Sequence, residues 1–336
     1  MTFVSQHLAS VLRPSSLSVR PPRTPAVAFL VLLLLFGAFG CAPDGSTSSD
    51  RDTEESQLSG IFADSYPVYY LVDRISGGVF DTESAIPDGE NPEYWLPPDA
   101  VVAKLQQARL LVLNGADLSA WVELAVLPEE RILETASAFQ SQWIKMEGST
   151  HSHGPEGEHS HTGIAPFTWL DPLQAIEQAK TIRDAVSELA PQEASGVKAR
   201  YEVLRLELTA LHEKLEAAAS LTPDRPLIAS HPLYSYPARR YNWNLVDLYW
   251  EPDELPSEDD WKAFDELRRE HPAKWMIWEA EPLPEVRRML AERGVGIVVI
   301  DPLVEAPETG DFLAVMQANT EALVRAMTEH PETDDG

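Results

Sequence analysis

The sequence predicts an α/β protein with two similar lobes joined by one long rigid helix. From about residue 59 onward, short apolar runs alternate with helical patterns, which is typical of chains whose strands and helices take turns. One long amphipathic stretch near residue 200 separates two such regions. The chain of 336 residues is long enough for two domains of about 100–200 residues each after removal of a leader.

An export leader is expected over residues 1–40. Residues 1–25 contain three arginines and no acidic residue, and the apolar run AVAFLVLLLLFGAFG follows at 26–40, directly before Cys41. This run is shorter than the roughly 20 residues of a membrane-spanning helix and is typical of a signal peptide. We therefore expect a lipoprotein whose lipidated first residue is Cys41, with plain secretion as the alternative.

The mature chain divides by composition and pattern. The polar residues after Cys41 predict a flexible tether over 41–58. An N-terminal lobe is expected over 59–192, a linking helix over 193–222 and a C-terminal lobe over 223–330. Strands are predicted at Ser65 to Leu71, Arg109 to Leu113, Pro226 to Ala229, Trp275 to Trp278 and Gly296 to Ile300.

The linking helix is predicted from its apolar spacing. The residues follow one another at intervals of four and three within a highly charged stretch: Val197, Tyr201, Leu204, Leu208, Leu211 and Leu215. Pro191 and Pro223 flank it. The pattern is too short to favour the alternative, a coiled-coil dimer, so we expect a monomer with a stiff connection between its lobes.

The charge of the chain excludes some partners. Its formal net charge is −28, from 26 basic and 54 acidic side chains. Such a field repels nucleic acid and anionic lipid headgroups and favours cations, although acidity also serves solubility. No nucleic-acid partner is expected.

A histidine-rich loop is the clearest candidate for metal contact. The segment HSHGPEGEHSH at 151–161 contains His151, His153, His159 and His161. Its glycines and proline prevent it from packing a core, while its imidazoles are borderline-soft ligands. The irregular spacing indicates auxiliary metal capture and not a closed structural zinc site.

Other polar residues follow predicted strands. His231 comes after RPLIAS and Asp301 after VGIVVI, where α/β sheets present ligands, although either could be an ordinary turn residue. Glu279 and Glu281 follow WMIW and are interpreted as a turn with one structural carboxylate. The serine-hydrolase elbow, the phosphate-binding loop and the dinucleotide fingerprint are all missing from the sequence. No catalytic residue is predicted.

Six segments in order resemble the zinc-uptake binding proteins of zinc and manganese ABC importers. They are YPVYYLVDRISGG from Tyr66, VLNGADLSAWVE at 112–123, FTWLDPLQAIEQAKTIRDAVSELAP at 167–191, SHPLYSYPARRY at 230–241, EAEPLPEVRRMLAERGVGIVVIDPL at 279–303 and GDFLAVMQANTEALV at 310–324. The resemblance implies two α/β lobes on one long helix, with a metal site in the cleft between the lobes. It also implies a histidine-rich loop ahead of the Trp-Leu-Asp-Pro turn, where 151–161 lies.

The resemblance assigns three metal ligands: Glu93, His231 and Asp301. His231 matches the histidine of zinc-type members, and Asp301 matches the aspartate ahead of Pro-Leu. Two positions depart from the family pattern, because Glu93 and Phe167 stand where the family has histidines. Phenylalanine cannot bind a metal. Three explanations stay open: a loop histidine replaces the missing ligand, the metal preference has shifted, or binding has been lost.

The expected function is therefore a non-enzymatic, extracytoplasmic binding protein. It would capture Zn²⁺, with Mn²⁺ or Fe²⁺ as alternatives, and deliver it to the permease of an ABC importer. A lipid anchor would hold it on a membrane facing the periplasm or the cell surface. The rival hypotheses are a metal-dependent hydrolase that uses an open zinc site and a metal-free adhesin on the same scaffold.

Overall fold

The computed structural model describes residues 58–146, 150–153, 157–160 and 163–329. All of these residues belong to one compact unit, Ser48–Gly336. The leader, Cys41 and nearly all of the proposed tether lie outside the described residues. No helix in the described ranges is both long and apolar enough to cross a membrane.

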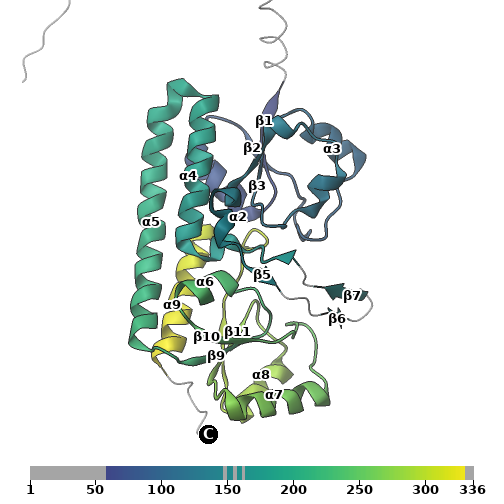
Figure 1. Ribbon diagram of the computed structural model, residues 1–336, viewed down its shortest axis with the longest axis vertical. Helices are drawn as coiled ribbons and strands as arrows, with labels where there is room; N and C mark the ends of the chain where they lie inside the picture. The colour runs from purple at the N-terminus through teal and green to yellow at the C-terminus, as the bar shows by residue number, and fades with distance from the viewer. Residues whose placement is uncertain (1–57, 147–149, 154–156, 161–162, 330–336) are drawn as a thin grey trace, which may run out of the picture. The chain divides into compact units, whose positions relative to one another are not determined.

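The first lobe is built on a parallel four-stranded sheet with the strand order β2-β1-β3-β4 (Figure 1). Its strands are β1 (Ser59–Ala63), β2 (Thr82–Ser84), β3 (Ala108–Leu113) and β4 (Ile132–Glu134). Its α-helices are α2 (Tyr66–Ser76), α3 (Asp99–Leu105) and α4 (Pro172–Leu189). Short 3₁₀ helices cover Ala120–Leu124, Glu129–Arg131, Thr135–Gln142, Thr168–Leu170 and Pro191–Glu193.

The second lobe repeats this topology. Its parallel sheet has the order β10-β9-β11-β12, formed by β9 (Pro226–Ala229), β10 (Asn244–Asp247), β11 (Trp275–Trp278) and β12 (Gly296–Val299). Its helices are α6 (Ser235–Arg240), α7 (Glu258–Glu270), α8 (Pro284–Glu292) and α9 (Phe312–Thr328). In both sheets the first strand in the chain lies between the second and the third. The prediction of two similar α/β lobes is confirmed.

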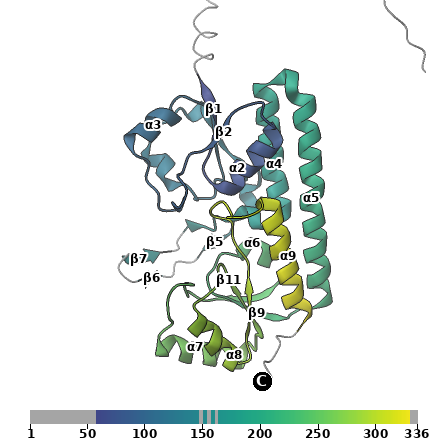
Figure 2. The same ribbon diagram turned by 180° about the vertical axis from the view of Figure 1, so that it is seen from behind.

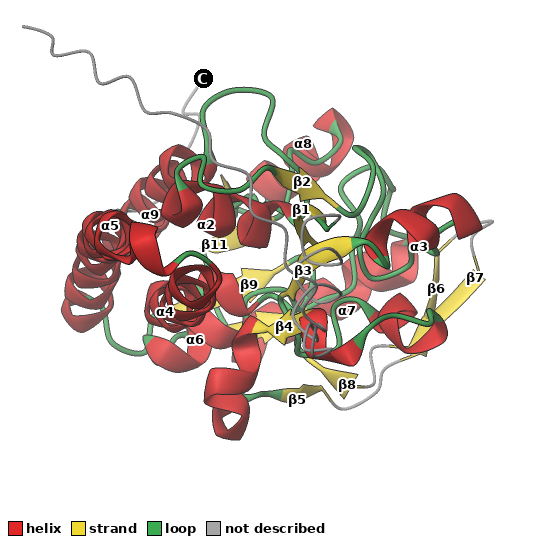
Figure 3. Ribbon diagram, turned by 90° about the horizontal axis from the view of Figure 1, so that it is seen from above, coloured by secondary structure: helices red, strands yellow, loops and turns green. Residues whose placement is uncertain are grey.

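The long helix α5 (Ala194–Leu221) spans 28 residues and connects the lobes. It packs against α2 and α4 of the first lobe and against α9, which follows the second sheet. Figures 2 and 3 show α4, α5 and α9 side by side along one flank. All six apolar residues of the predicted stripe are buried. Because the stripe is covered within the chain, it is not available for a coiled-coil dimer.

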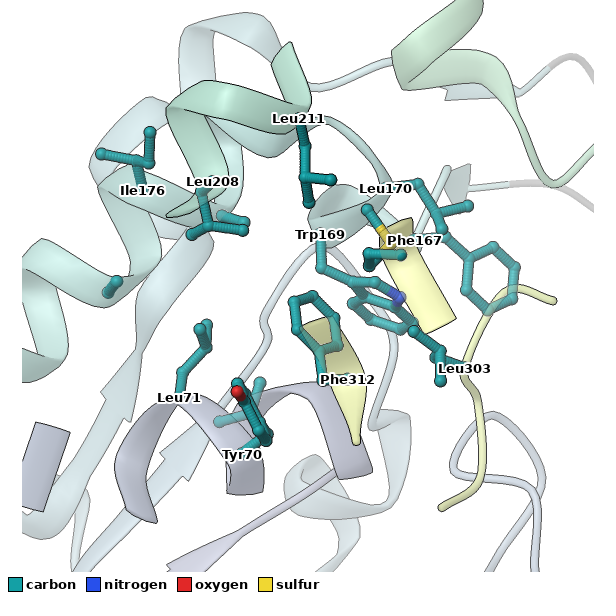
Figure 4. Packing of buried hydrophobic residues seen from close by; sticks show 14 of the residues in the cluster. Tyr70, Leu71, Phe167, Trp169, Leu170, Ile176, Leu208, Leu211, Leu303 and Phe312 are labelled. Atoms are coloured by element: carbon teal, nitrogen blue, oxygen red, sulfur yellow. The ribbon is translucent and has the colours of Figure 1, made fainter. Parts of the chain in front are cut away.

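A continuous apolar core fixes the lobes to each other (Figure 4). One cluster of buried residues includes Ile61 and Val112 of the first sheet, Leu208 of α5, and Ile277 and Val298 of the second sheet. Dense packing of this kind resists deformation. The helical flank therefore gives the two lobes a rigid connection.

One predicted strand is wrong. Residues Ser65 to Leu71 do not form a strand, because α2 begins at Tyr66, and the first strand of the sheet is instead β1, which lies between β2 and β3. Pro67 lies in the first turn of α2, where its missing N–H costs nothing. The buried residues Val68, Leu71, Val72 and Ile75 recur at three- and four-residue spacing, which is helical and not strand-like.

An ion pair with a buried carboxylate also connects the lobes. Asp171, which caps α4, has only 1% of its side chain exposed, and its Oδ2 accepts a hydrogen bond of 2.8 Å from Nε of Arg240 in α6, whose terminal guanidinium nitrogen lies 2.7 Å away. Replacing Arg240 by alanine leaves this carboxylate buried without its cation, so we expect a loss of about 2 kcal/mol in the free energy of unfolding. Urea denaturation measures it.

The neighbouring residue provides the matched control. Arg239 lies over the ring of Tyr236, 5.4 Å from its centroid, and an exposed cation–π contact contributes about 0.5–1 kcal/mol. Arg239→Ala should therefore cost clearly less than Arg240→Ala. Equal losses would show that the ion pair with Asp171 adds nothing specific.

Candidate metal centre

His231 lies at the carboxyl end of the second sheet. It follows β9 and Ser230, whose backbone N–H donates to the carbonyl of Ile277 in β11. Its ring packs edge-on against Tyr249, with the centroids 6.0 Å apart, and 11% of its side chain is exposed. The imidazole thus lies near the point between β9 and β11 where the strand order reverses, a position at which α/β sheets bind ligands.

Two glutamates of the same lobe contact each other beside His231. Glu279 follows β11 directly, and Glu251 lies in the loop after β10. Glu251 Oε1 is 3.8 Å from His231 Nε2, and the carboxyl groups of Glu251 and Glu279 share a hydrogen bond. Burial raises the pKa of Glu279 to about 7, and the contacts with Glu251 and the charge of Glu93 act in the same direction.

Glu93 brings first-lobe charge to the same region. It lies in the loop between β2 and α3, where its backbone N–H donates to Asn91 Oδ1 at 2.9 Å. Burial raises the pKa of its carboxyl group to about 7. Burial also raises the pKa of Tyr94 to about 12, with added effects from the charges of Glu93 and Glu251. The loop carrying Glu93 therefore lies within electrostatic range of the second-lobe glutamates.

Asp301 follows β12 and begins the Asp-Pro-Leu turn. Its Oδ1 accepts a hydrogen bond of 2.7 Å from the backbone N–H of Leu303, and its own N–H donates to Asn319 Oδ1 at 3.2 Å. Burial raises the pKa of its carboxyl group. Leu303 is fully buried and has a φ of 60°, an unusual conformation for a side chain of this kind. The turn is therefore held in one specific shape.

The charge of Asp301 also reaches its neighbours in the second sheet. The negative charges of Glu279 and Asp301 both disfavour ionisation of the buried Tyr234, whose pKa lies well above its usual value, chiefly because of burial. Glu279 and Asp301 therefore lie at the same edge of the second sheet.

Phe167 is part of the core. It is 4% exposed and packs edge-on against Trp169, with ring centroids 5.4 Å apart. Trp169 Nε1 in turn donates to the carbonyl of Pro302 at 2.8 Å, beside Asp301. Figure 4 shows Phe167 and Trp169 next to Leu303 of the second lobe. An apolar ring thus occupies the position at which the resemblance implies a histidine.

The described residues contain no group of three His, Cys, Asp or Glu side chains close enough together to hold one metal ion. The structure brings Glu251 into contact with both His231 and Glu279, and the charge of Glu93 acts on Glu279. The set of Glu93, His231 and Asp301 stays a prediction. Glu251 was missed because the short strand before it, β10, has no long apolar run in the sequence.

The histidine-rich segment forms a short antiparallel hairpin. Strands β6 (Thr150–His153) and β7 (Gly157–Ser160) pair with His151 opposite His159. A second pair, β5 (Lys145–Met146) and β8 (Gly163–Ile164), joins the base of this segment. The side chains of His151, His153 and His159, and the whole of His161, lie outside what the structure describes, so their role as auxiliary ligands stays a prediction.

A cavity of about 630 Å³ opens at the corresponding edge of the first sheet. Its wall includes Asp64, which follows β1 and is completely buried. The Asp64 carboxylate accepts hydrogen bonds from the backbone N–H of Asn114 at 2.9 Å and from the hydroxyls of Ser65 and Ser119 at 3.0 Å each. Burial nevertheless raises its pKa to about 6. Neighbouring donors of the first lobe therefore satisfy this carboxylate.

A family model described as "Zinc-uptake complex component A periplasmic" matches residues 61–326. Among curated proteins, the chain is similar to the zinc-binding lipoprotein AdcA of Streptococcus pneumoniae, with 25% identity over 77% of this chain and 54% of AdcA. It is also similar to the high-affinity zinc uptake system protein ZnuA of Bacillus subtilis, with 27% identity over 86% of this chain and 93% of ZnuA.

The solved structures show the same fold. The metal-dependent lipoprotein YcdH of Bacillus subtilis superposes with a TM-score of 0.68 at 20% identity, over 80% of this chain and 98% of YcdH. At this identity the likeness concerns the fold alone. The chain spans about half the length of the AdcA relatives that it matches.

Proposed function

We propose a metal-delivery function on the premise that this chain belongs to the family of zinc-uptake complex component A proteins. In this function the chain captures a divalent transition metal, zinc first, and delivers it to the permease of an ABC importer. Members of this family are solute-binding proteins of importers and not enzymes, so the prediction of a non-enzymatic protein is confirmed at the family level. The metal ion is the cargo, and the proposed function includes no chemical reaction.

The observation that carries the proposal is the position of His231. It is a largely buried imidazole at the strand reversal of the second sheet, and its Nε2 lies 3.8 Å from the carboxylate of Glu251. Imidazole and carboxylate groups are the donors that zinc and manganese accept in proteins. We propose Glu93, His231 and Asp301 as ligands contributed from both lobes.

Phe167 favours an altered metal preference as the second candidate. A site with one imidazole and several carboxylates is harder than the nitrogen-rich sites that suit zinc, so Mn²⁺ or Fe²⁺ gains relative to Zn²⁺. A loop histidine that reached the cleft would restore the nitrogen donor and the zinc preference. The two candidates differ in which metal binds most tightly.

The remaining proposals concern location. Relatives of this chain are named as lipoproteins, which supports a lipid anchor at Cys41 on an extracytoplasmic membrane face. Mass spectrometry of the membrane fraction should then find acylated Cys41. Intact residues 1–40 in that fraction would contradict the anchor.

Calorimetric titration of the fragment 42–336 with zinc, manganese, iron(II) and copper tests the function. Elemental analysis should first establish what the purified protein already carries. Tight binding of at least one of these ions is expected. Preference for zinc supports a histidine from the loop, preference for manganese or iron supports the harder set, and no binding would leave the fold without this function, as in the adhesin hypothesis.

A further inference from the structure

We propose that Glu251 and Glu279 bind the metal together with His231, and that this second-lobe pair replaces the imidazole lost at Phe167. The inference rests on the proposed function and adds two ligands to it. Neither glutamate belongs to the set that the family resemblance assigns.

The positions of the three residues support this assignment. His231, Glu251 and Glu279 follow three neighbouring parallel strands, β9, β10 and β11, whose carboxyl ends meet at one edge of the sheet. Ligands of α/β sheets bind outside this edge, at the strand reversal between β9 and β11. Three loops of the second lobe thus direct polar side chains to one place.

The distances require only small side-chain movements. Two ligands on one zinc ion, each bound at 2.0–2.1 Å, lie about 3.3 Å from each other in tetrahedral geometry. His231 Nε2 and Glu251 Oε1 are 3.8 Å apart, and Glu251 already shares a hydrogen bond with Glu279. His231 and Glu251 are thus close to the spacing of two ligands on one ion, and Glu279 adjoins Glu251.

The hydrogen bond between the two carboxyl groups also favours a cation. Two carboxylates can share a hydrogen bond only when one carries a proton, because ionised carboxylates are acceptors and not donors. A divalent cation replaces that proton and neutralises both groups.

At the corresponding edge of the first lobe, a buried structural carboxylate has hydrogen-bond donors around it. Asp64 accepts hydrogen bonds from Asn114, Ser65 and Ser119 and so has local donors for its charge. Glu279 follows β11 as Asn114 follows β3, but it faces another acid. The two lobes share their topology and differ in this pairing, which points to a cation at the second-lobe edge.

Three substitutions in the mature chain, Glu251→Gln, Glu279→Gln and Glu281→Gln, test the proposal. Glutamine keeps the shape of the side chain and removes its charge. We expect each of the first two to weaken the binding of the preferred ion at least tenfold in calorimetric competition. Glu281 lies two residues beyond Glu279, is exposed and pairs with Arg287, so its variant should stay within about twofold of the wild type.

X-ray absorption at the bound metal supplies a readout independent of affinity. One imidazole and at least three oxygen donors are expected for the wild type, whereas two or more imidazoles would mean that loop histidines and not the glutamates complete the site. If His231→Ala weakens binding but neither glutamine variant does, this inference is overturned and the proposed function stands. If the wild type binds none of the metals, the function itself fails.

Discussion

His231→Ala should weaken the binding of the preferred metal at least tenfold. Alanine removes the imidazole that lies at the strand reversal and contacts Glu251 at 3.8 Å, and no carboxylate can supply a nitrogen donor in its place. The loss should be larger for zinc than for manganese, since zinc depends more on nitrogen ligands. Competition titrations with a chromogenic chelator measure both affinities in one protein.

His212→Ala is the matched control for this substitution. His212 lies on α5, where its Nδ1 is 3.2 Å from the hydroxyl of Tyr241 and its ring stacks on the same residue. Its loss should change stability modestly and leave the metal affinity unchanged. Unchanged affinity in His231→Ala would remove His231 from the site, and equal losses in both variants would indicate a general effect on folding.

The sequence was a good guide to the architecture wherever apolar spacing was long and regular. The stripe from Val197 to Leu215 predicted the buried face of α5, because six residues in helical register identify one side of a helix. The strands near Arg109, Pro226, Trp275 and Gly296 were found from short apolar runs. The segment Ser65 to Leu71 failed because a short apolar run fits either period, and Pro67 decided for the helix.

The site was harder to predict, because its contacts join residues far apart in the chain. His231 and Asp301 were identified from strand ends and from the family resemblance. Glu251 follows a four-residue strand, Asn244–Asp247, that has no clear apolar signal. Glu279 was interpreted as a structural turn residue. Its hydrogen bond with Glu251 depends on the order of strands in the sheet, which the sequence does not contain.

The structural role of Phe167 was also not predictable from the sequence. The sequence showed that it replaces a histidine, but not what the ring does instead. The structure shows it packed on Trp169 in the core that joins the lobes, so the position now contributes to apolar packing. Metal binding at this end of the cleft must therefore depend on other residues.

The affinity for the metal should fall steeply on acidification. Burial raises the pKa of both Glu93 and Glu279 to about 7, so protons compete with the metal below that pH. If one of these carboxylates binds the ion, acidification from pH 7.5 to 5.5 weakens metal binding about 25-fold. If both carboxylates bind the ion, the same acidification weakens metal binding roughly 600-fold. Carboxylates with an ordinary pKa would stay ionised throughout this range. Titrations at fixed ionic strength measure the slope.

Glu279→Gln separates the two carboxylates. His231 is present in both proteins, so the comparison changes only the carboxylate of Glu279. The slope of log affinity against pH between 5.5 and 6.5 should be smaller in the variant by up to about one unit, since one competing proton is gone. An identical slope would mean that Glu279 does not exchange its proton for the metal.

The stability of the metal-free protein should change in the opposite direction. In the folded state Glu93 and Glu279 hold protons up to a pH of about 7, whereas in the unfolded chain they lose them near 4.5. Between these values the folded state binds more protons, so the free energy of unfolding falls as the pH rises. A bound metal offsets this loss by neutralising the same carboxylates. Melting temperatures from pH 5 to 7.5 should therefore decline without metal and hold or rise with it, and parallel curves would show that metal and proton do not share these groups.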